Sequence, residues 1–154
     1  MKEDTLCFVA SSGGHLQEIL CLQELMLSKP SFLITEYDGI KNRNIKVPTY
    51  YVKQINRKEK LFFLHFIKLF FLFTKLMKKN KPKYIITTGA LIAFPACIVG
   101  KIMGKRIIYI ESFARVTHPS LTGKLIYCFA DLFIIQWKPL LKYYPNAIYT
   151  GGIF

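Results

Sequence analysis

The clearest hydrophobic pattern in the chain is an apolar run at residues 6–10 that leads into a pair of glycines and then into helical periodicity. An unbroken apolar run of this length is typical of a strand buried on both faces. Apolar residues then recur at helical spacing, at Leu16, Ile19, Leu20, Leu22 and Leu25. This succession predicts the first strand, turn and helix of a doubly wound α/β domain.

The same succession recurs further along the chain. The apolar run at residues 84–88 ends in Gly89 and Ala90, and helical spacing follows over residues 92–103. Alternation of this kind favours parallel strands joined by helices. Further strands are predicted at residues 32–35, 50–52, 106–110, 131–136 and 147–150, and further helical segments at residues 121–129 and 138–143. We therefore expect an α/β fold with a Rossmann-like doubly wound parallel sheet, in a single domain over residues 1–154.

The glycine pair after the first strand is the first candidate for chemistry. Gly13 and Gly14 lack a Cβ, so they permit a positive φ and a close approach of the backbone to a ligand. The backbone N–H groups that follow Ser12 then face the crevice above the strands, together with the start of the helix, and can bind phosphate or sugar hydroxyls. His15 begins that helix, within reach of such a ligand. The alternative is a tight turn with an incidental histidine.

A carboxylate is predicted at the same edge of the sheet. Glu111 directly follows the strand at residues 106–110, and after position 60 the chain has no acidic residue besides Glu111 and Asp131. At the carboxyl end of a parallel strand, Glu111 would orient or deprotonate a substrate hydroxyl, or hold His15 in one tautomer. The alternative is an ion pair with Arg115.

The loops after the later strands add candidates for substrate binding. Because the carboxyl ends of parallel strands meet at one edge of a sheet, we expect Thr88 and Gly89 to lie near Ser112. The loop at residues 113–122 carries Arg115, which suits a phosphate or a lipid-linked headgroup. A simple packing role for the small residues is the alternative. The predicted substrate-binding residues are Ser12, Gly13, Gly14, Thr88, Gly89, Ser112 and Arg115.

Charge and composition narrow the class of partner. The 154 residues include 22 Lys and Arg against 9 Asp and Glu, a net charge of +13. Such an excess favours an anionic partner: nucleic acid, an anionic membrane surface or a phosphorylated substrate. A hydrophobic fraction of 52% with 13 Phe is higher than a nucleic-acid-binding module needs. We therefore expect a bilayer surface rather than nucleic acid.

The basic and apolar residues coincide in one segment, predicted as a helix over residues 57–79. Residues 61–73 are almost continuously apolar, but this run is shorter than the roughly 20 residues of a spanning helix and contains His65 and Lys68. Its basic side chains form one stripe on a helix: Arg57, Lys58, His65, Lys68, Lys75 and Lys79.

We therefore expect this helix to lie on an anionic bilayer surface. The predicted membrane contacts are Phe62, Phe63, Phe66, Lys68, Phe70 and Lys75. The alternative is a crossover helix that is buried by a second layer of its own fold or by a partner subunit.

The cysteines and the N-terminus indicate a reducing compartment. Cys7, Cys21, Cys97 and Cys128 fall in apolar segments without a C-x-x-C pair, so they are interpreted as small core residues. Residues 1–4 lead into a strand too soon for the apolar region of a signal peptide. We therefore expect a cytoplasmic chain.

Several of these segments, taken in order, resemble a known family. The segments are residues 11–16, 88–89, 110–116, 121–124, 130–137 and 144–149. They resemble the PssD-like bacterial exopolysaccharide and capsule proteins, the prokaryotic relatives of the membrane-recruiting subunit of the bipartite N-glycan GlcNAc transferase. The glycine-rich loop with its histidine is also similar to that of the MurG N-terminal domain.

The resemblance implies the N-terminal, acceptor-side half of a GT-B glycosyltransferase. A separate PssE-like subunit would bring the nucleotide-sugar pocket, and a polyprenyl-diphosphate-linked sugar would be the acceptor in capsular or exopolysaccharide biosynthesis. The chain would lie peripherally on the cytoplasmic face of the plasma membrane.

For the reaction, the resemblance implies attack of an acceptor hydroxyl on the anomeric carbon of a nucleotide sugar, with inversion. His15 would be the catalytic base, Glu111 would lie beside the acceptor, and Gly13 and Gly14 would shape the loop over the diphosphate. No metal-ligand cluster is recognisable, so we expect neither a metal nor another cofactor.

Two alternatives stay open. In the first, the chain is a non-catalytic recruiting or enhancer subunit, and its partner performs all of the chemistry. In the second, the chain is a nucleotide-binding module that acts alone, which would require the isolated chain to bind nucleotide sugars.

Overall fold

The computed structural model describes residues 4–37, 39, 45–54 and 62–153. Within these residues, one parallel sheet has the strand order β3-β2-β1-β4-β5-β6-β7. Its strands are β1 (Leu6–Ala10), β2 (Ser31–Tyr37), β3 (Thr49–Lys53), β4 (Tyr84–Thr87), β5 (Arg106–Ile110), β6 (Leu132–Ile135) and β7 (Ile148–Tyr149). The order reverses between β1 and β4, so the predicted doubly wound parallel sheet is confirmed.

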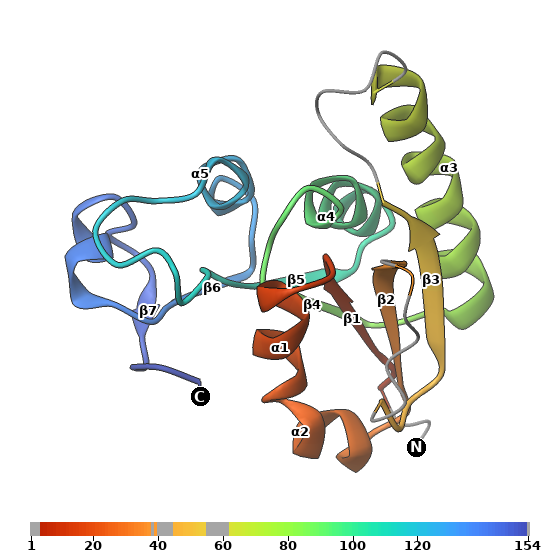
Figure 1. Cartoon of the computed structure of the whole chain (residues 1–154), viewed down its shortest axis with the longest axis horizontal. Coiled ribbons are helices and arrows are strands. Elements are labelled where there is room, and N and C mark those ends of the chain that lie inside the picture. Colours follow the sequence, from red (N-terminus) through yellow and green to blue (C-terminus); the bar gives the residue numbers. More distant parts are fainter. Residues whose placement is uncertain (1–3, 38, 40–44, 55–61, 154) are drawn as a thin grey trace.

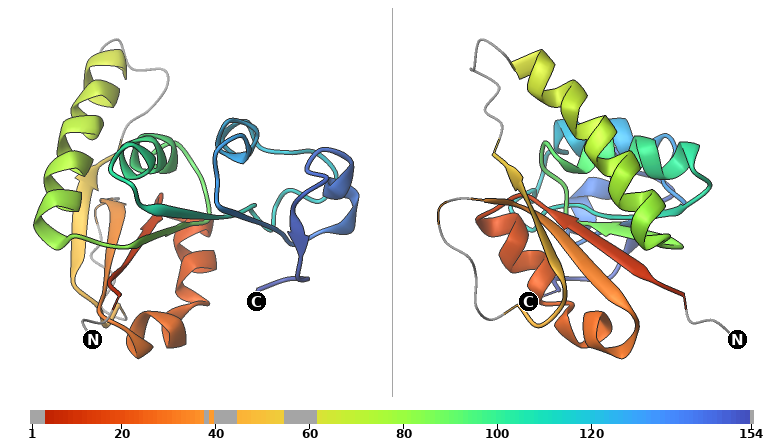
Figure 2. Two further views of the ribbon diagram at one scale, coloured as in Figure 1. Left: turned by 180° about the vertical axis from the view of Figure 1, so that it is seen from behind. Right: turned by 90° about the vertical axis from the view of Figure 1, so that its right-hand side faces the viewer.

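Helices cover both faces of this sheet (Figure 1 and Figure 2). One face carries α1 (Gly14–Leu20) and α2 (Gln23–Ser28). The other face carries α3 (Phe62–Asn80), α4 (Ala93–Ile102) and α5 (Leu121–Tyr127). A short 3₁₀ helix, η1 (Lys138–Lys142), lies between β6 and β7 in the sequence. The predicted basic helix therefore exists as α3, and residues 57–61 of the predicted range lie outside the described residues.

The core has one layer on each side of the sheet, and β1 contributes to both. Cys7 and Val9 point to the layer of α3 and α4, whereas Leu6, Phe8 and Ala10 pack with residues of α1 and α2. All residues of β1 are buried, because helices cover both faces of a central parallel strand. Cys7 and Cys97 are core residues as predicted, whereas Cys21 and Cys128 are exposed, so the prediction of four core cysteines is wrong for these two.

The strand predicted at residues 84–88 ends one residue early, and this matters for the site. β4 stops at Thr87. Gly89 and Ala90 have φ values of 100° and 69°, so the chain turns away from the sheet. A Cβ at Gly89 would lie 2.7 Å from the Tyr109 hydroxyl, so only glycine fits here. The turn leaves Thr88 over the start of α1.

Candidate functional site

The carboxyl ends of β1, β4 and β5 surround a cleft of about 500 Å³. This is the edge at which the strand order reverses, where ligands bind in doubly wound sheets. The cleft brings together His15, Ser112 and Arg115 of the predicted site. Its other lining residues are Ala90, Leu91, Ala114, Ser120, Leu121 and Thr122.

His15 is held by reciprocal hydrogen bonds with Thr88. The Nδ1 atom of His15 lies 2.8 Å from the carbonyl oxygen of Thr88, and the Thr88 hydroxyl donates to the carbonyl oxygen of His15 at 2.8 Å. A carbonyl can only accept, so Nδ1 carries the proton of the neutral imidazole. The Nε2 atom is then unprotonated and can accept a proton or a hydrogen bond.

The glycine loop stands open to solvent in front of His15. Gly13 caps α1 at φ 78° and ψ −139°, a conformation that side chains rarely adopt. Gly14 has no positive φ, and a Cβ built there would meet nothing within 4 Å. Both residues are exposed, and half-buried Ser12 precedes them. The backbone conformation therefore requires glycine at position 13. At position 14 the fold itself does not require glycine, because a side chain would have free space there.

Glu111 does not lie where a base for the acceptor would have to lie. Its side chain is fully buried and does not line the cleft. Its Oε1 atom accepts from the Ser112 N–H at 3.0 Å. Its Oε2 atom accepts from the Ser120 N–H and hydroxyl, both at 3.1 Å, and from the Tyr144 hydroxyl at 2.8 Å. This geometry corrects the predicted role, because these bonds hold the loop between β5 and α5 and tie it to Tyr144, which follows η1.

The predicted alternative, an ion pair between Glu111 and Arg115, is also not formed in the part of the chain that the structure describes. Arg115 is exposed at the cleft, and its backbone N–H donates to the carbonyl of Ser112. Burial, followed by the charge of Glu111, raises the pKa of the Tyr144 hydroxyl, so this group stays a donor to the carboxylate. Arg115 therefore lines the cleft without an ion pair to Glu111.

Glu18 is a second buried carboxylate next to the cleft residues, and the sequence reasoning missed it. It lies on α1 one turn after His15 and is 4% exposed. Its Oε1 atom accepts from the Ser112 hydroxyl at 2.9 Å and the Phe113 N–H at 3.0 Å. Its Oε2 atom is buried without a hydrogen-bond partner. Burial raises the pKa of Glu18 above its ordinary value. The i, i+3 spacing from His15 was the available signal.

The remaining predicted substrate-binding residues make hydrogen bonds within the protein that hold the cleft in place. The Thr88 side chain is fully buried and positions His15. The N–H of Gly89 donates to the Thr87 hydroxyl at 3.1 Å, which fixes the turn beneath the cleft. The hydroxyl of Ser112 donates its hydrogen bond to Glu18. Of the predicted set, His15 and Arg115 therefore line the cleft as its polar groups, Thr88 positions His15, and Gly89 shapes the turn after β4.

The surface of α3 differs from the predicted set of membrane contacts. Phe62, Phe66 and Phe70 are half-buried against the core, and Phe66 stacks on Phe94 of α4 at 6.5 Å between ring centroids. The exposed apolar residues are Phe63 (77%), Leu64 (48%), Ile67 (49%) and Phe71 (73%), which we call the α3 apolar face. Three lysines, Lys68, Lys75 and Lys78, are exposed beside it.

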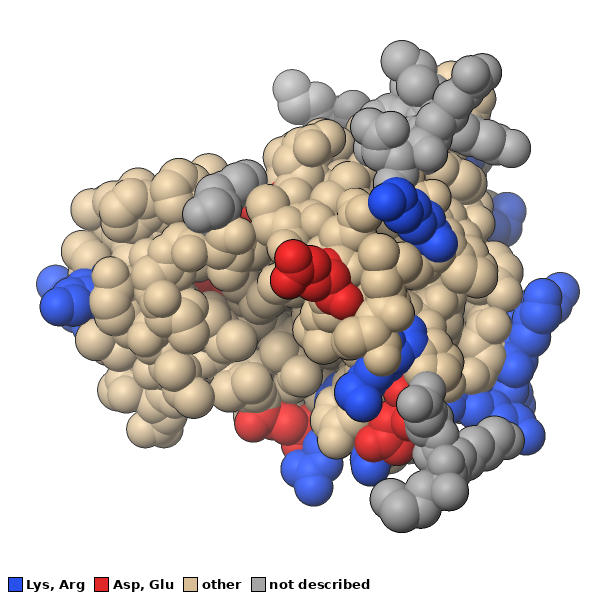
Figure 3. Space-filling view, turned by 90° about the horizontal axis from the view of Figure 1, so that it is seen from below, with Lys and Arg blue, Asp and Glu red and all other residues tan. Residues whose placement is uncertain are grey.

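On the face seen in Figure 3, most visible basic side chains lie on the half of the molecule that carries α3. Among the residues that the structure describes, no helix has the length and apolar character to cross a bilayer. Within the same residues, no group of three or more His, Cys, Asp or Glu side chains is placed to hold a metal ion.

Most of the chain is similar to a described family and to named proteins. The family model described as "Oligosaccharide biosynthesis protein Alg14 like" matches residues 60–153. The UDP-N-acetylglucosamine transferase subunit ALG14 of Mus musculus is 30% identical over 179 residues, which cover 96% of this chain and 82% of the mouse protein.

Solved structures show the same fold at low sequence identity. MurG of Acinetobacter baumannii superposes with a TM-score of 0.74 at 17% identity, over 88% of this chain and 42% of MurG. The UDP-N-acetylglucosamine 2-epimerase of Rickettsia bellii gives 0.76 at 12% identity, over 98% of this chain and 45% of the epimerase. The chain thus spans less than half the length of these solved proteins. Its Rossmann-like fold is that of the N-terminal half of GT-B glycosyltransferases.

Proposed function

The chain belongs to the Alg14-like family of oligosaccharide biosynthesis proteins, and from this premise we propose that it is the acceptor-binding subunit of a two-component inverting glycosyltransferase. It would associate peripherally with the cytoplasmic face of the plasma membrane and receive a polyprenyl-diphosphate-linked acceptor. The sugar would come from a nucleotide sugar held by a PssE-like partner subunit. The product would enter capsular or exopolysaccharide biosynthesis.

The observation that carries this proposal is the orientation of His15. Its hydrogen bond to the Thr88 carbonyl leaves Nε2 as the basic atom of an imidazole that lines the cleft. In the proposed reaction, an acceptor hydroxyl attacks the anomeric carbon, the bond to the nucleoside diphosphate breaks, and Nε2 takes the hydroxyl proton. A base of this kind typically contributes about 10²–10⁴-fold to the rate.

The cleft also offers groups for an anionic acceptor. Arg115 lies exposed at the cleft, and the open loop at Gly13 and Gly14, which precedes His15 but is not part of the cleft lining, permits close approach of a diphosphate to the backbone. A guanidinium suits phosphate oxygens because its donors form a planar fork. These features support a diphosphate-linked acceptor on this chain and a nucleotide sugar on its partner.

The need for a partner is supported by the comparisons. The mouse relative is named a transferase subunit, and the match to MurG is confined to less than half of that protein. In the proposal, the second lobe of the GT-B architecture is supplied by another polypeptide, and the active cleft forms between the two.

The direct test is to co-express the chain with a candidate nucleotide-sugar-binding subunit and to assay sugar transfer to a polyprenyl-diphosphate-linked acceptor. A donor screen that includes UDP-N-acetylglucosamine would identify the sugar. We expect transfer only when both chains are present. Full activity of the isolated chain, or activity of the partner that is indifferent to this chain, would contradict the proposal.

A second candidate function is a non-catalytic recruiting or enhancer subunit. The burial of Glu111 favours it, because one of the two predicted catalytic side chains does not reach the cleft. In this case the partner supplies the base, and His15 serves only to position the acceptor. Kinetics of His15 variants separate the two functions.

A further inference from the structure

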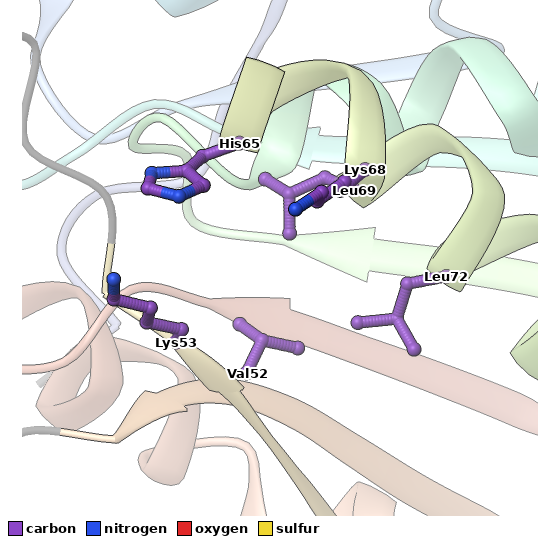
Figure 4. A pocket seen from close by; sticks show the side chains of 6 residues that line it. All are labelled: Val52, Lys53, His65, Lys68, Leu69 and Leu72. Atoms are coloured by element: carbon purple, nitrogen blue, oxygen red, sulfur yellow. The ribbon is translucent and has the colours of Figure 1, made fainter. Parts of the chain in front are cut away.

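A second cavity, which shares no lining residue with the cleft at His15, lies between the edge strand β3 and α3. This β3–α3 pocket has a volume of about 240 Å³ and is lined by Val52, Lys53, His65, Lys68, Leu69 and Leu72. Figure 4 shows Val52 and Lys53 coming from β3, and the other four side chains from α3.

The interior of the pocket is apolar and its polar lining is basic. Val52 and Leu69 are almost fully buried, and Leu72 is half-buried beside them. Lys53 and Lys68 are exposed, one from each wall, and neither forms an ion pair within the described part of the chain. The acidic residue nearest in register is Glu36, opposite Val52, and it is buried and does not line the pocket.

The size of the pocket limits what can enter it. Pockets for whole small molecules usually measure about 300–1,000 Å³. A smaller apolar pocket fits part of a ligand, such as the end of a hydrocarbon chain. The two exposed lysines of its lining complement an anionic group at the other end of that ligand. These two properties together describe an amphiphile with an acidic head.

The pocket also borders the surface that would meet a bilayer. Lys68 follows Leu64 by one helical turn, so the two side chains are neighbours on α3. Leu64 belongs to the α3 apolar face. A headgroup held by Lys53 and Lys68 would therefore lie at the edge of the face that is proposed to contact lipid.

We propose that the β3–α3 pocket is a binding site for one acidic phospholipid molecule, with its phosphate between Lys53 and Lys68 and hydrocarbon on Val52, Leu69 and Leu72. This inference rests on the proposed membrane-associated role. In addition to the non-specific contact of the α3 apolar face with the bilayer, the chain would then bind one lipid molecule at a defined site. The bound lipid would fix the orientation of α3 on the bilayer.

The test uses monomeric short-chain lipid, so that binding is measured without a bilayer. Titration of the whole chain with dihexanoyl-phosphatidylglycerol below its micelle concentration should show saturable one-to-one binding by calorimetry. The double variant Lys53→Gln/Lys68→Gln should bind about tenfold or more weakly. The matched control Lys75→Gln/Lys78→Gln carries the same change of charge on exposed residues outside the pocket and should bind like the wild type.

Four results would overturn the proposal. They are no saturable binding, equal weakening in both double variants, equal binding of dihexanoyl-phosphatidylcholine, and equal binding of inorganic phosphate, which would show a phosphate site rather than a lipid site.

Leu72→Trp tests the apolar part, since it should weaken lipid binding while leaving both lysines in place. Vesicle flotation of the wild type separates this inference from the proposed function. If the chain floats with vesicles but does not bind monomeric lipid, only the pocket proposal is contradicted. If it binds monomeric lipid but does not float, only the proposed membrane association is contradicted.

Discussion

The Nδ1 atom of His15 lies 2.8 Å from the carbonyl oxygen of Thr88, and the Thr88 hydroxyl returns a hydrogen bond to the carbonyl of His15 at 2.8 Å. This pair joins the first turn of α1 to the end of β4 across the point where the strand order reverses. It fixes both the tautomer and the position of the imidazole.

His15→Ala should lower kcat of the assembled two-component enzyme by about 10²-fold or more, because it removes the basic Nε2 atom from the cleft. Steady-state kinetics with the partner present, together with co-purification, would measure this effect. His118→Ala is the control, since His118 is exposed on the loop and pairs with Thr117. An unchanged rate with an intact complex would favour the recruiting function.

Thr88→Val should lower kcat while costing about 1 kcal/mol of unfolding free energy, because it removes one buried hydrogen bond without changing the side-chain shape much. The imidazole then loses part of its positional restraint. Thr74→Val is a matched control: the Thr74 hydroxyl also donates to a backbone carbonyl, that of Phe70, but on α3. The Thr88 carbonyl that binds Nδ1 is kept in this variant, so equal rates for both variants would show that the Thr88 hydroxyl does not position His15.

The glycine loop gives opposite expectations for its two positions. Gly13→Ala should destabilise the fold by about 1–3 kcal/mol, because its backbone conformation is nearly restricted to glycine. Gly14→Ala meets no protein atom and should leave stability unchanged or slightly increased. If a diphosphate approaches this loop, Gly14→Ala should still raise KM for the acceptor. Thermal unfolding and acceptor titrations measure the two effects, and an unchanged KM would place the diphosphate elsewhere.

Glu18 should make stability depend on pH above the ordinary glutamate pKa of about 4.3. Burial raises the pKa of Glu18, so just above that value the folded chain keeps a proton that the unfolded chain has lost. The unfolding free energy therefore falls as pH rises through this window and levels off above the pKa of the folded state.

Glu18→Gln carries no such proton and should remove this component of the slope. Urea unfolding at a series of pH values compares it with the wild type, and Glu24→Gln, at an exposed position of α2, is the control. The prediction fails if the slopes of wild type and Glu18→Gln coincide.

The α3 apolar face should govern attachment to anionic vesicles. Phe63→Ser/Phe71→Ser removes two rings that are 77% and 73% exposed, and should weaken flotation with phosphatidylglycerol vesicles about tenfold or more. Folding should be little affected, since neither ring belongs to the core. Ile102→Ser/Leu27→Ser is the control, because these residues are exposed and apolar but lie on other helices. Undiminished flotation of the Phe variant would place the membrane contact elsewhere.

The hydrophobic pattern was sufficient for the order of the elements. Residues 6–10, 84–88 and 106–110 were predicted as strands because central parallel strands are buried on both faces and appear as continuous apolar runs. The glycines at positions 13, 14 and 89 marked the turns at the carboxyl edge, and the topology of such sheets brings those turns together. His15 and Arg115 could therefore be assigned to one cleft before their contacts were known.

The division of roles at the site depended on tertiary structure. Glu111 and Glu18 are both carboxylates near the same edge, and sequence position favoured Glu111. Glu111 is instead surrounded by donors from Ser112, Ser120 and Tyr144, while Glu18 retains a buried oxygen without a partner. Hydrogen-bond donors from three separate segments decide this, and spacing along the chain does not encode their convergence.

The same limit applies to α3. Its periodicity determined an amphipathic basic helix, but a helix that is apolar around most of its circumference does not reveal which side packs on the sheet. Packing against Phe94 of α4 half-buries Phe66 and leaves Phe63 and Phe71 exposed. The strands, their turns and the basic helix could be predicted from the amino-acid order alone, because they depend on local periodicity and backbone freedom. Which side chains reach the cleft and the surface is set by the folded chain, because it depends on contacts between residues far apart in the sequence.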